Sequence, residues 1–461
     1  MKTPVAGENN DIQQSKAFKK MALGLLTFGL ITLIVLAAGA FLAFGYIRRS
    51  IEATSLNIPL LANQPVTNQI AFVGNDDNLW LVSPDGSNLR NVTDDGRGYR
   101  FPTWAPDGRR LAFLGPNESN SSVLYISPTS KSEPVVVFNR SNSAPFYLYW
   151  APNSQSITFL TQETSGLSMR QIDTQDPEID RTLAEGAPFY WVWSPDSDKM
   201  LMHVGGSRTA SNKAHISLLE NQPDADRVEL DLAPGSFQAP VWSSNAEYIY
   251  YIAADGEGQE SVFRTNARTL QQDVLVDLDG LAAHLVLSPD DRHLAYLQLE
   301  GGTRAPFGKA YLVDPENQKS KLVMEDPVAS MYWSPDGSKL ALLSLSRANE
   351  GPTAKAGGLA APLPQQPLLL RWWIYDIETG DLEPLVSFFP TPSFLQTVPF
   401  FDQYHLSLTF WSPDSRYFLV SKGEEDNGSG SGDGTVWVID TSGQQEPLKV
   451  GMGTMAVWSW Q

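Results

Sequence analysis

The chain has 461 residues, a formal net charge of −19 and no cysteine. Without cysteine it has no disulfides, no thiol nucleophile and no cysteine for lipid attachment, so the fold depends on its core alone. The first 50 residues carry six Lys or Arg and two Asp or Glu, which leaves −23 for the remainder. A domain this acidic repels phosphate backbones, so we expect no nucleic acid partner and no direct adhesion to anionic lipid.

The first predicted element is a membrane-spanning helix. Met21 to Ile47 comprises 27 residues without a charge between Lys19-Lys20 and Arg48-Arg49, and about 20 apolar residues suffice to cross a bilayer. A cleaved signal peptide is the alternative, because small residues occur at Ala38-Gly39-Ala40. Its apolar region, however, is normally only about 7 to 15 residues long.

The charges beside this segment predict its orientation. Four lysines precede it and two arginines follow it, and the more positive flank stays in the cytoplasm. We therefore expect a cytoplasmic tail over residues 1–20, a transmembrane helix over 21–47, a linker over 48–67 and an extracytoplasmic domain over 68–461. This placement favours the cell membrane of a bacterial envelope, with the membrane bound through Met21 to Ile47.

The rest of the chain repeats a motif of Trp, Ser or Ala, Pro, Asp and a small residue. Pro suits the second position of a type I turn and Gly its exit, so the motif predicts a strand-turn-strand corner. A period of about 40 to 45 residues is typical of β-propeller blades. The copies begin at Trp104, Trp150, Trp193, Trp242, Leu287, Trp333, Trp411 and Trp458, at steps of 46, 43, 49, 45, 46, 78 and 47 residues.

The number of units and the two chain ends predict a closed ring. The first unit lacks a Trp-bearing strand, and the last, near Met455 to Trp460, has nothing after it. We therefore predict that the C-terminal strand completes the blade opened by Ile70–Val73, which removes the free edges. The fold class is all-β, an eight-bladed β-propeller with one N-terminal transmembrane α-helix; seven blades is the alternative if one degenerate unit is not a blade. The strands after the turns are expected to begin near residues 70, 111, 157, 200, 249, 294, 340 and 417.

Two stretches carry a resemblance to a known family. Leu79 to Leu89 (LWLVSPDGSNL) and Phe101 to Phe113 (FPTWAPDGRRLAF) resemble the repeat of the TolB-type, WD-like propeller family, and the likeness extends over residues 68–461. The resemblance implies an extracytoplasmic protein-interaction module. The same repeat also occurs in the gating propellers of prolyl oligopeptidase and dipeptidyl peptidase relatives. Residues 50–67 cannot hold the α/β domain that precedes the TolB propeller, and no hydrolase domain follows, so the partners of TolB are not carried over.

Three long segments depart from the repeat: Ser346 to Leu370, Ser387 to Tyr404 and Lys422 to Gly434. All three are expected on the face opposite the Ser-Pro-Asp turns, and segments this long are usually functional or disordered. The second is aromatic, so it is either a cap packed on its own propeller or a partner-binding patch. The third is acidic over 424–433 and fails the EF-hand spacing, which favours a solvated loop over a calcium site. The candidate partner-binding residues are Trp372, Trp373, Phe388, Phe389, Phe394, Phe400, Phe401 and Tyr404.

Catalytic motifs are scarce. The sequence has no Gly-x-Ser-x-Gly elbow, no His-Glu-x-x-His motif and only five histidines, of which His284 is expected to line the central channel as a satisfied side chain. We expect no cofactor, no metal and a noncatalytic binding or scaffold subunit of an envelope complex, with a protein or other ligand as its partner. The alternative is a hydrolase or lyase working in the axial pocket. A sensor is a third reading, but a tail of about 20 residues is too short for a signalling domain.

The point of entry into the ring predicts how the domain sits on the membrane. The chain arrives before Ile70 on the face that bears the turns, so we expect this face to look toward the membrane and Phe388 to Phe401 to point away from it. The 17 linker residues from Ser50 to Val66 weaken this expectation, because they can reach roughly 56 Å.

Overall fold

The computed structural model describes residues 68–119, 121–128, 133–164, 166–186, 189–205, 214–223, 225–236, 238–255, 257–278, 283–299, 307–346, 369–423 and 433–461. Three predicted segments lie outside these residues: the tail (1–20), the transmembrane helix (21–47) and the linker (48–67). Most residues of the two excursions 346–370 and 422–434 also lie outside them. Within the described ranges, no helix is long and apolar enough to cross a membrane.

Strands make up more than half of the described residues and are rich in β-branched and aromatic residues, which suit a pleated, buried surface. The first half contains β1 (Ile70–Gly74), β2 (Leu79–Val82), β3 (Arg90–Asn91), β4 (Arg100–Trp104), β5 (Arg110–Pro116), β6 (Ser122–Pro128), β7 (Val135–Phe138), β8 (Ala144–Trp150), β9 (Ser156–Glu163), β10 (Gly166–Asp173), β11 (Asp180–Gly186), β12 (Phe189–Trp193), β13 (Lys199–Val204), β14 (His215–Glu220) and β15 (Arg227–Glu229). The second half contains β16 (Ala233–Pro234), β17 (Val241–Trp242), β18 (Tyr248–Ala254), β19 (Glu260–Asn266), β20 (Gln272–Asp277), β21 (Ala283–Leu287), β22 (Leu294–Leu299), β23 (Gly308–Val313), β24 (Ser320–Trp333), β25 (Lys339–Leu345), β26 (Leu370–Asp376), β27 (Leu382–Phe388), β28 (Tyr417–Gly423), β29 (Gly434–Asp440) and β30 (Leu448–Trp458). Three short helices interrupt them: α2 (Pro392–Thr397), η1 (Val398–Phe400) and α3 (Phe401–Tyr404).

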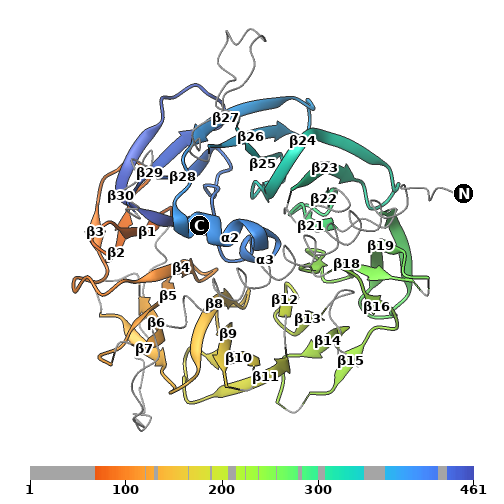
Figure 1. Ribbon diagram of the computed structural model, residues 1–461, viewed down its shortest axis with the longest axis horizontal. Coiled ribbons are helices and arrows are strands. Elements are labelled where there is room, and N and C mark those ends of the chain that lie inside the picture. Colours follow the sequence, from red (N-terminus) through yellow and green to blue (C-terminus); the bar gives the residue numbers. More distant parts are fainter. Residues whose placement is uncertain are drawn as a thin grey trace, which may run out of the picture. The chain divides into compact units, whose positions relative to one another are not determined.

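The described strands form six antiparallel sheets that follow one another around a common axis as a β-propeller (Figure 1). Three have four strands: β4 to β7, β8 to β11 and β12 to β15. A fourth has five strands, with β16 and β17 both pairing β18. The strands after the turns begin within one residue of their predicted starts, which confirms those predictions, at Ile70, Arg110, Ser156, Lys199, Tyr248, Leu294, Lys339 and Tyr417.

Two long strands each serve two groups of strands. The start of β24 pairs β23 up to Val328, and its end pairs β25 up to Trp333, which gives a seven-stranded sheet from β21 to β27. Likewise, β30 pairs β29 through Leu448 to Met452 and β1 through Gly453 to Trp458, which gives a six-stranded sheet. Nothing in the sequence repeat predicted that single strands would bridge two groups.

The ring closes through its C-terminal strand, as predicted. Ile70 pairs with Trp458 and Ala71 with Val457. Beyond the strands, the backbone N–H of Ser459 donates to the Gln69 carbonyl at 2.8 Å. The first and last residues of the described domain therefore lie together, and β1 has no open edge toward the axis.

The repeated tryptophan joins neighbouring inner strands. A buried indole N–H needs an acceptor, and here the preceding inner strand supplies it, so the motif fixes the distance between successive strand groups. In five described copies the indole donates at 3.0–3.3 Å in this way: Trp104 to Val457 O, Trp150 to Thr103 O, Trp242 to Val192 O, Trp333 to Val286 O and Trp411 to Tyr332 O. The other two described tryptophans of the repeat donate to side chains, Trp193 to the Thr158 hydroxyl at 3.2 Å and Trp458 to Asn68 at 2.8 Å.

The Ser-Pro-Asp turn is a local hydrogen-bonded clasp. In one copy, the Ser334 hydroxyl donates to Asp336 at 2.7 Å and accepts from the backbone N–H of Lys339 at 2.9 Å. Because Asp and Ser both bond to nearby backbone groups, they favour turns over continued strand. The same pair of contacts occurs at Ser194, Ser288 and Ser412.

The residue after the motif's Asp or Asn links one turn to the next. It adopts a left-handed conformation, with φ of +60°, +66° and +60° at Ser154, Ser197 and Ser415. Glycine suits this conformation best, but a serine there adds a contact: Ser154 accepts from the backbone N–H of Asp107 at 3.0 Å in the preceding turn. Equivalent bonds join Asn153 to Ser197 and Asp336 to Ser415. We call these contacts the turn latches.

Candidate functional site

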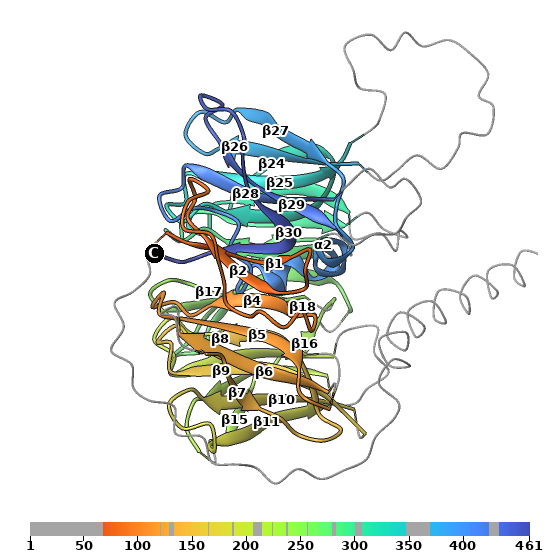
Figure 2. The same ribbon diagram turned by 90° about the vertical axis from the view of Figure 1, so that its left-hand side faces the viewer.

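The second excursion folds into the middle of the ring. We call residues 389–410 the plug; they contain α2, η1 and α3, which lie near the axis in Figure 1 and on the side away from the C-terminus in Figure 2. Thr391 is the N-cap of α2, because its hydroxyl accepts from the backbone N–H of Phe394 at 3.3 Å. Pro392 follows in the first turn of the helix, where its missing N–H costs nothing.

The plug is tied to β28 at both of its ends. The Gly423 N–H donates to Phe389 O at 2.7 Å, and the Leu419 N–H donates to Phe410 O at 2.7 Å. A Cβ on Gly423 would lie 3.1 Å from the Pro390 carbonyl oxygen, so glycine permits this close approach. The plug thus takes the place of an inner strand beside β28. In the described residues its pairing with β28 is limited to two isolated bridges, Pro390 with Lys422 and Trp411 with Phe418.

Gln403 is the plug's neutral polar anchor, and it is buried. Its side-chain oxygen accepts from the Trp191 N–H at 3.0 Å, and its amide donates to Trp191 O at 2.9 Å and to the Tyr147 hydroxyl at 2.5 Å. The Tyr147 hydroxyl in turn donates to the backbone carbonyl of Gln403 at 3.0 Å. Every polar atom of the amide is therefore satisfied by β8 and β12.

Asp402 is the plug's charged anchor. It is fully buried, and its Oδ2 accepts from the Ala239 N–H at 2.8 Å and meets His284 Nδ1 at 3.0 Å. Its Oδ1 has no hydrogen-bond partner among the described residues. His284 was predicted to be a satisfied core or channel side chain, and its contact with Asp402 agrees with a satisfied side chain. Its ring centroid lies 5.4 Å from that of Phe401.

The groups around Asp402 are histidines and tyrosines. Burial lowers the pKa of His203 to about 4 and lowers the pKa of His405 below its ordinary value. Burial, and then the charge of Asp402, raise the pKa of Tyr190 and of Tyr332. These side chains are therefore neutral at pH 7. The Asp402–His284 arrangement, a buried carboxylate that orients an imidazole through Nδ1, is chemically able to support general-base catalysis.

The candidate partner-binding residues divide by exposure. Trp372, Phe388 and Phe401 are 1%, 3% and 1% exposed, so they belong to the buried core at and beneath the plug. Trp373, Phe389, Phe394 and Tyr404 are half-buried. Phe400 is 46% exposed and is joined on the plug surface by Leu395, which is 38% exposed and was not singled out from the sequence.

The aromatic side chains pack the plug against its own propeller. Tyr404 meets Tyr147 edge-on at 5.0 Å between ring centroids, and Phe394 meets Phe388 at 5.7 Å and Trp372 at 6.2 Å. Edge-on aromatic pairs at such distances are favourable beyond the area they bury. The segment is therefore a cap on its own ring, the first of the two interpretations of its aromatic composition.

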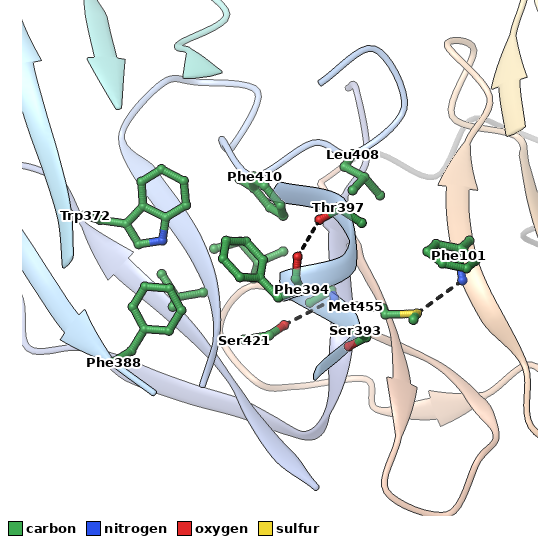
Figure 3. A pocket seen from close by; sticks show the side chains of 13 residues that line it. Phe101, Trp372, Phe388, Ser393, Phe394, Thr397, Leu408, Phe410, Ser421 and Met455 are labelled. Atoms are coloured by element: carbon green, nitrogen blue, oxygen red, sulfur yellow. Dashed lines mark hydrogen bonds between the residues drawn. The ribbon is translucent and has the colours of Figure 1, made fainter. Parts of the chain in front are cut away.

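A small pocket lies between α2 and the surrounding strands (Figure 3). Its volume is about 30 Å³, and a water molecule requires roughly 10–15 Å³ by this measure. The pocket therefore has room for about two waters and cannot admit a sugar or nucleotide as it stands. Its lining residues are Phe101, Trp372, Phe388, Ser393, Phe394, Thr397, Leu408, Phe410, Leu419, Val420, Ser421, Met455 and Ala456.

Sequence reasoning missed the anchors Asp402, Gln403 and Tyr147. They lie in different parts of the chain and share no local motif; only the lack of charge from Ser387 to Phe401, followed directly by one carboxylate, hinted that this carboxylate is buried. Across the described residues, no group of three or more His, Cys, Asp or Glu side chains is arranged to hold a metal ion.

Comparisons with known proteins agree on the architecture only. No protein-family model and no curated protein matches the chain. Similar solved structures include TolB from Acinetobacter baumannii (14% identity, 76% of this chain and 83% of that one, TM-score 0.37) and oligogalacturonate lyase from Vibrio parahaemolyticus (14%, 81% and 97%, 0.49). A eukaryotic initiation factor is also similar (13%, 85% and 98%, 0.48). At these identities and TM-scores the likenesses carry no information on activity.

Proposed function

We propose that the chain is a membrane-anchored, extracytoplasmic propeller of TolB type that serves as a noncatalytic binding or scaffold subunit of an envelope complex. The membrane anchor is Met21 to Ile47, the cytoplasmic tail is residues 1–20, and the partner is a protein. The uncharged segment between two basic pairs supports the anchor, and the Ser-Pro-Asp repeat supports the family.

The plug is the observation that carries the proposal. An enzyme of this fold class needs an open axial pocket for substrate, but here α3 occupies the axis and bonds to inner strands on several sides through Gln403 and Asp402. Displacing it would break these hydrogen bonds and expose apolar side chains that are now buried, such as Phe401, which is costly. A protein that fills its own channel in this way is better suited to binding on its surface.

The exposed side of the plug is the binding surface. Leu395 and Phe400 are exposed there, and no charged residue occurs from Ser387 to Phe401. Aromatic residues without neighbouring charge are enriched at the centre of protein interfaces. Phe389 and Trp373 are half-buried, and we propose that they belong to the same binding surface, on the side of β26 and β27.

The ring that presents this surface has eight blades in our proposal. The sheets bridged by β24 and β30 each divide into two groups of strands at the point where the long strand changes partner. Seven blades would require one of these groups not to be a blade. The group of β28 and β29 is the weakest, because its inner strand is reduced, in the described residues, to isolated bridges at Pro390 and Trp411.

A hydrolase or lyase remains the second candidate because of the Asp402–His284 pair. This reading requires the plug to open and His284 to act as a general base. If His284→Asn abolishes a defined turnover while the melting temperature is unchanged, the enzyme reading replaces the scaffold reading.

The test of binding uses tagged full-length protein purified in mild detergent, with copurifying proteins quantified by mass spectrometry. We expect a specific partner that is lost when Leu395 and Phe400 are both changed to Ser. Leu89→Ser with Ile179→Ser is the matched control, since these residues are 52% and 46% exposed in loops elsewhere on the ring. An unchanged set of copurifying proteins in the plug variant contradicts the proposal.

The turn face is proposed to look toward the membrane. The chain enters this face at Asn68, which is bonded to Gln461, and the Gln461 amide donates to Pro106 O in a turn at 3.2 Å. The plug would then point outward to the partner. Membrane-impermeant labelling combined with depth-dependent quenching of a probe at position 396 tests this, and quenching by lipid would reverse the orientation.

A further inference from the structure

Three of the five histidines in the chain gather around Asp402 of the plug. His284 of β21 meets its carboxylate at 3.0 Å. The charge of Asp402 also acts on His203 of β13 and on His405 of the plug. One fully buried carboxylate therefore faces imidazoles from two different parts of the ring and from its own segment.

The plug seals His203 and His405 from water. Ala239 donates to Asp402, and the amide of its neighbour Gln238 lies 3.3 Å from His203 Nδ1. Removal of the plug therefore uncovers the segment that contacts His203. His405 belongs to the plug itself, and its buried Nδ1 has no hydrogen-bond partner among the described residues. Both rings would gain contact with water if the plug left the ring.

The other titratable groups at this site do not offset the charge of a protonated histidine. Four are tyrosines, which stay neutral well below pH 10: Tyr147 of β8, Tyr190 of β12, Tyr332 of β24 and Tyr404 of the plug. His215 of β14 acts on His203 as a second imidazole, so its charge opposes that of His203. The histidines are therefore the groups here whose charge changes between pH 7 and pH 5.

Protonation of the buried histidines favours release of the plug. Burial holds the pKa of His203 at about 4 and that of His405 below its ordinary value, whereas hydrated rings take up a proton near pH 6.5. Release therefore binds protons, and His203 alone makes it about twentyfold more favourable at pH 5 than at pH 7. His284 acts in the opposite direction, because its protonation turns its contact with Asp402 into an ion pair.

The plug can leave while the ring stays closed. In the described residues its pairing with β28 consists of isolated bridges, whereas ring closure pairs β1 directly with β30. Residues 389–410 contain one carboxylate, one histidine and no Lys or Arg. The hydrogen bonds and apolar contacts of this uncharged segment hold it at pH 7, and proton uptake by the histidines opposes them in acid.

We infer that the plug is an acid-released cap: protonation of His203 and His405 frees residues 389–410 from the ring between pH 7 and pH 5 and opens the axial channel. The freed segment carries Leu395 and Phe400, so acidification also withdraws the proposed binding surface. This second consequence rests on the proposed function, whereas the opening of the channel does not.

The first experiment measures release directly and needs no partner. The chain has no cysteine, so spin labels can be placed on full-length protein in detergent through Gln396→Cys on the plug and Ser141→Cys on the ring, both at exposed positions. A second pair, Ser141→Cys with Thr269→Cys, reports on the ring alone. We expect a narrow distance distribution for both pairs at pH 7, and at pH 5 a broad one for the plug pair only.

Two results of this experiment overturn the inference. One is a plug pair that stays narrow down to pH 5. The other is broadening of both pairs together, which means that the whole ring unfolds in acid. A partner that stays bound at pH 5 after the plug pair has broadened supports the inference and contradicts the proposed function instead.

Histidine variants then test the trigger. We expect His203→Gln and His405→Gln each to lower the pH at which the plug pair broadens, and the double variant to keep it narrow at pH 5. His293→Gln, at a turn on the other face, is the matched control and should leave the transition in place. If the double variant does not fold at pH 7, the two single variants decide. A transition at the same pH in the parent and in these variants overturns the inference.

Discussion

The two faces of the propeller hold neighbouring strand groups together in different ways. On the turn face, a Trp indole or a turn latch joins one strand group to the next, and a Ser-Asp clasp closes each turn on itself, all within a few residues of the motif. On the opposite face, the plug contacts six inner strands. These contacts join Ser407 to Thr103 of β4, Gln403 to Tyr147 of β8 and Trp191 of β12, Asp402 to His284 of β21, Phe401 to Tyr332 of β24 and Thr409 to Trp458 of β30. The turn face is thus stabilised by many small, repeated contacts, and the plug face by a few large ones.

This difference predicts how many strands are destabilised when one contact is lost. Losing one turn latch affects one pair of neighbours, and its cost should add to that of a distant latch. Losing a plug anchor affects several inner strands together. The changes below test this contrast, beginning with the closure of the ring, on which both faces depend.

Deleting residues 455–461 should have the largest effect. It removes the strand segment that pairs with Ile70 and Ala71, together with Trp458, which is fully buried. Truncating one buried Trp alone typically costs roughly 3–5 kcal/mol, and an open edge on β1 adds to that. We expect loss of the cooperative thermal transition and rapid proteolysis of the full-length protein. If the truncated protein melts and resists protease like the intact one, the closure account is wrong.

Asp402→Ala should destabilise the protein by roughly 3–5 kcal/mol, the range for removing one partner of a buried pair. It leaves the Ala239 N–H without its acceptor and His284 without its carboxylate. Asp402→Asn keeps an acceptor for Ala239 and should cost less. Urea unfolding followed by tryptophan fluorescence gives both values. An alanine variant as stable as the parent would show that the plug is not held by this anchor.

Acidification should destabilise the native state through His203. Its folded-state pKa is about 4, below the ordinary value of 6.5. Between these values the unfolded chain binds a proton that the native state does not, so stability falls as pH drops from 6.5 to 4, by about 3 kcal/mol. Burial of His405 acts in the same direction.

His203→Gln should flatten this part of the pH profile, measured as the free energy of unfolding from pH 7 to pH 4. His293→Gln, a histidine at a turn on the other face, serves as the control and should leave the slope in place. A parent protein whose stability is constant from pH 7 to pH 4 would contradict the burial of neutral histidines beneath the plug.

Turn latches should give the smallest changes. Ser154→Ala loses the bond from Asp107 and should cost about 1 kcal/mol, the usual net value of one hydrogen bond. Ala246 occupies the equivalent position, with φ of +58°, but has no hydroxyl. Ala246→Ser should therefore gain up to about 1 kcal/mol by accepting from Asp196. Calorimetry of both variants tests the rule, which fails if Ala246→Ser is destabilising.

The same contrast explains what the sequence could predict. The turn face is encoded within a few residues, so the repeat located the strands after the turns to within one residue and foresaw closure by the C-terminal strand. The plug face depends on contacts between distant residues. The aromatic composition of 387–404 indicated either a cap or a partner-binding patch. Nothing local indicated α2 and α3, or that Asp402 and Gln403 would find partners in different parts of the ring.

Three β-bulges on inner strands were also not predictable from the sequence. At these bulges Phe101, Tyr147 and Met455 have left-handed backbone conformations, although none of them is a glycine or asparagine, the residue types that usually signal this conformation. Their backbone is set by the plug and the neighbouring strands rather than by their own preference. The exposed Leu395 and Phe400 differ from the buried Phe388 and Phe401 only in their position in the folded structure, which aromatic spacing alone does not reveal.

The central claim is that the plug is an integral part of the ring and closes the axial channel. Hydrogen exchange of the full-length protein in detergent, read by mass spectrometry, tests it most directly. The account predicts that the amides of residues 401–408, together with those of Trp191 and Ala239, exchange as slowly as the inner strands and open only with global unfolding. Exchange of 401–408 at the rate of an unstructured peptide, while the strands stay protected, would show an open channel and contradict the account.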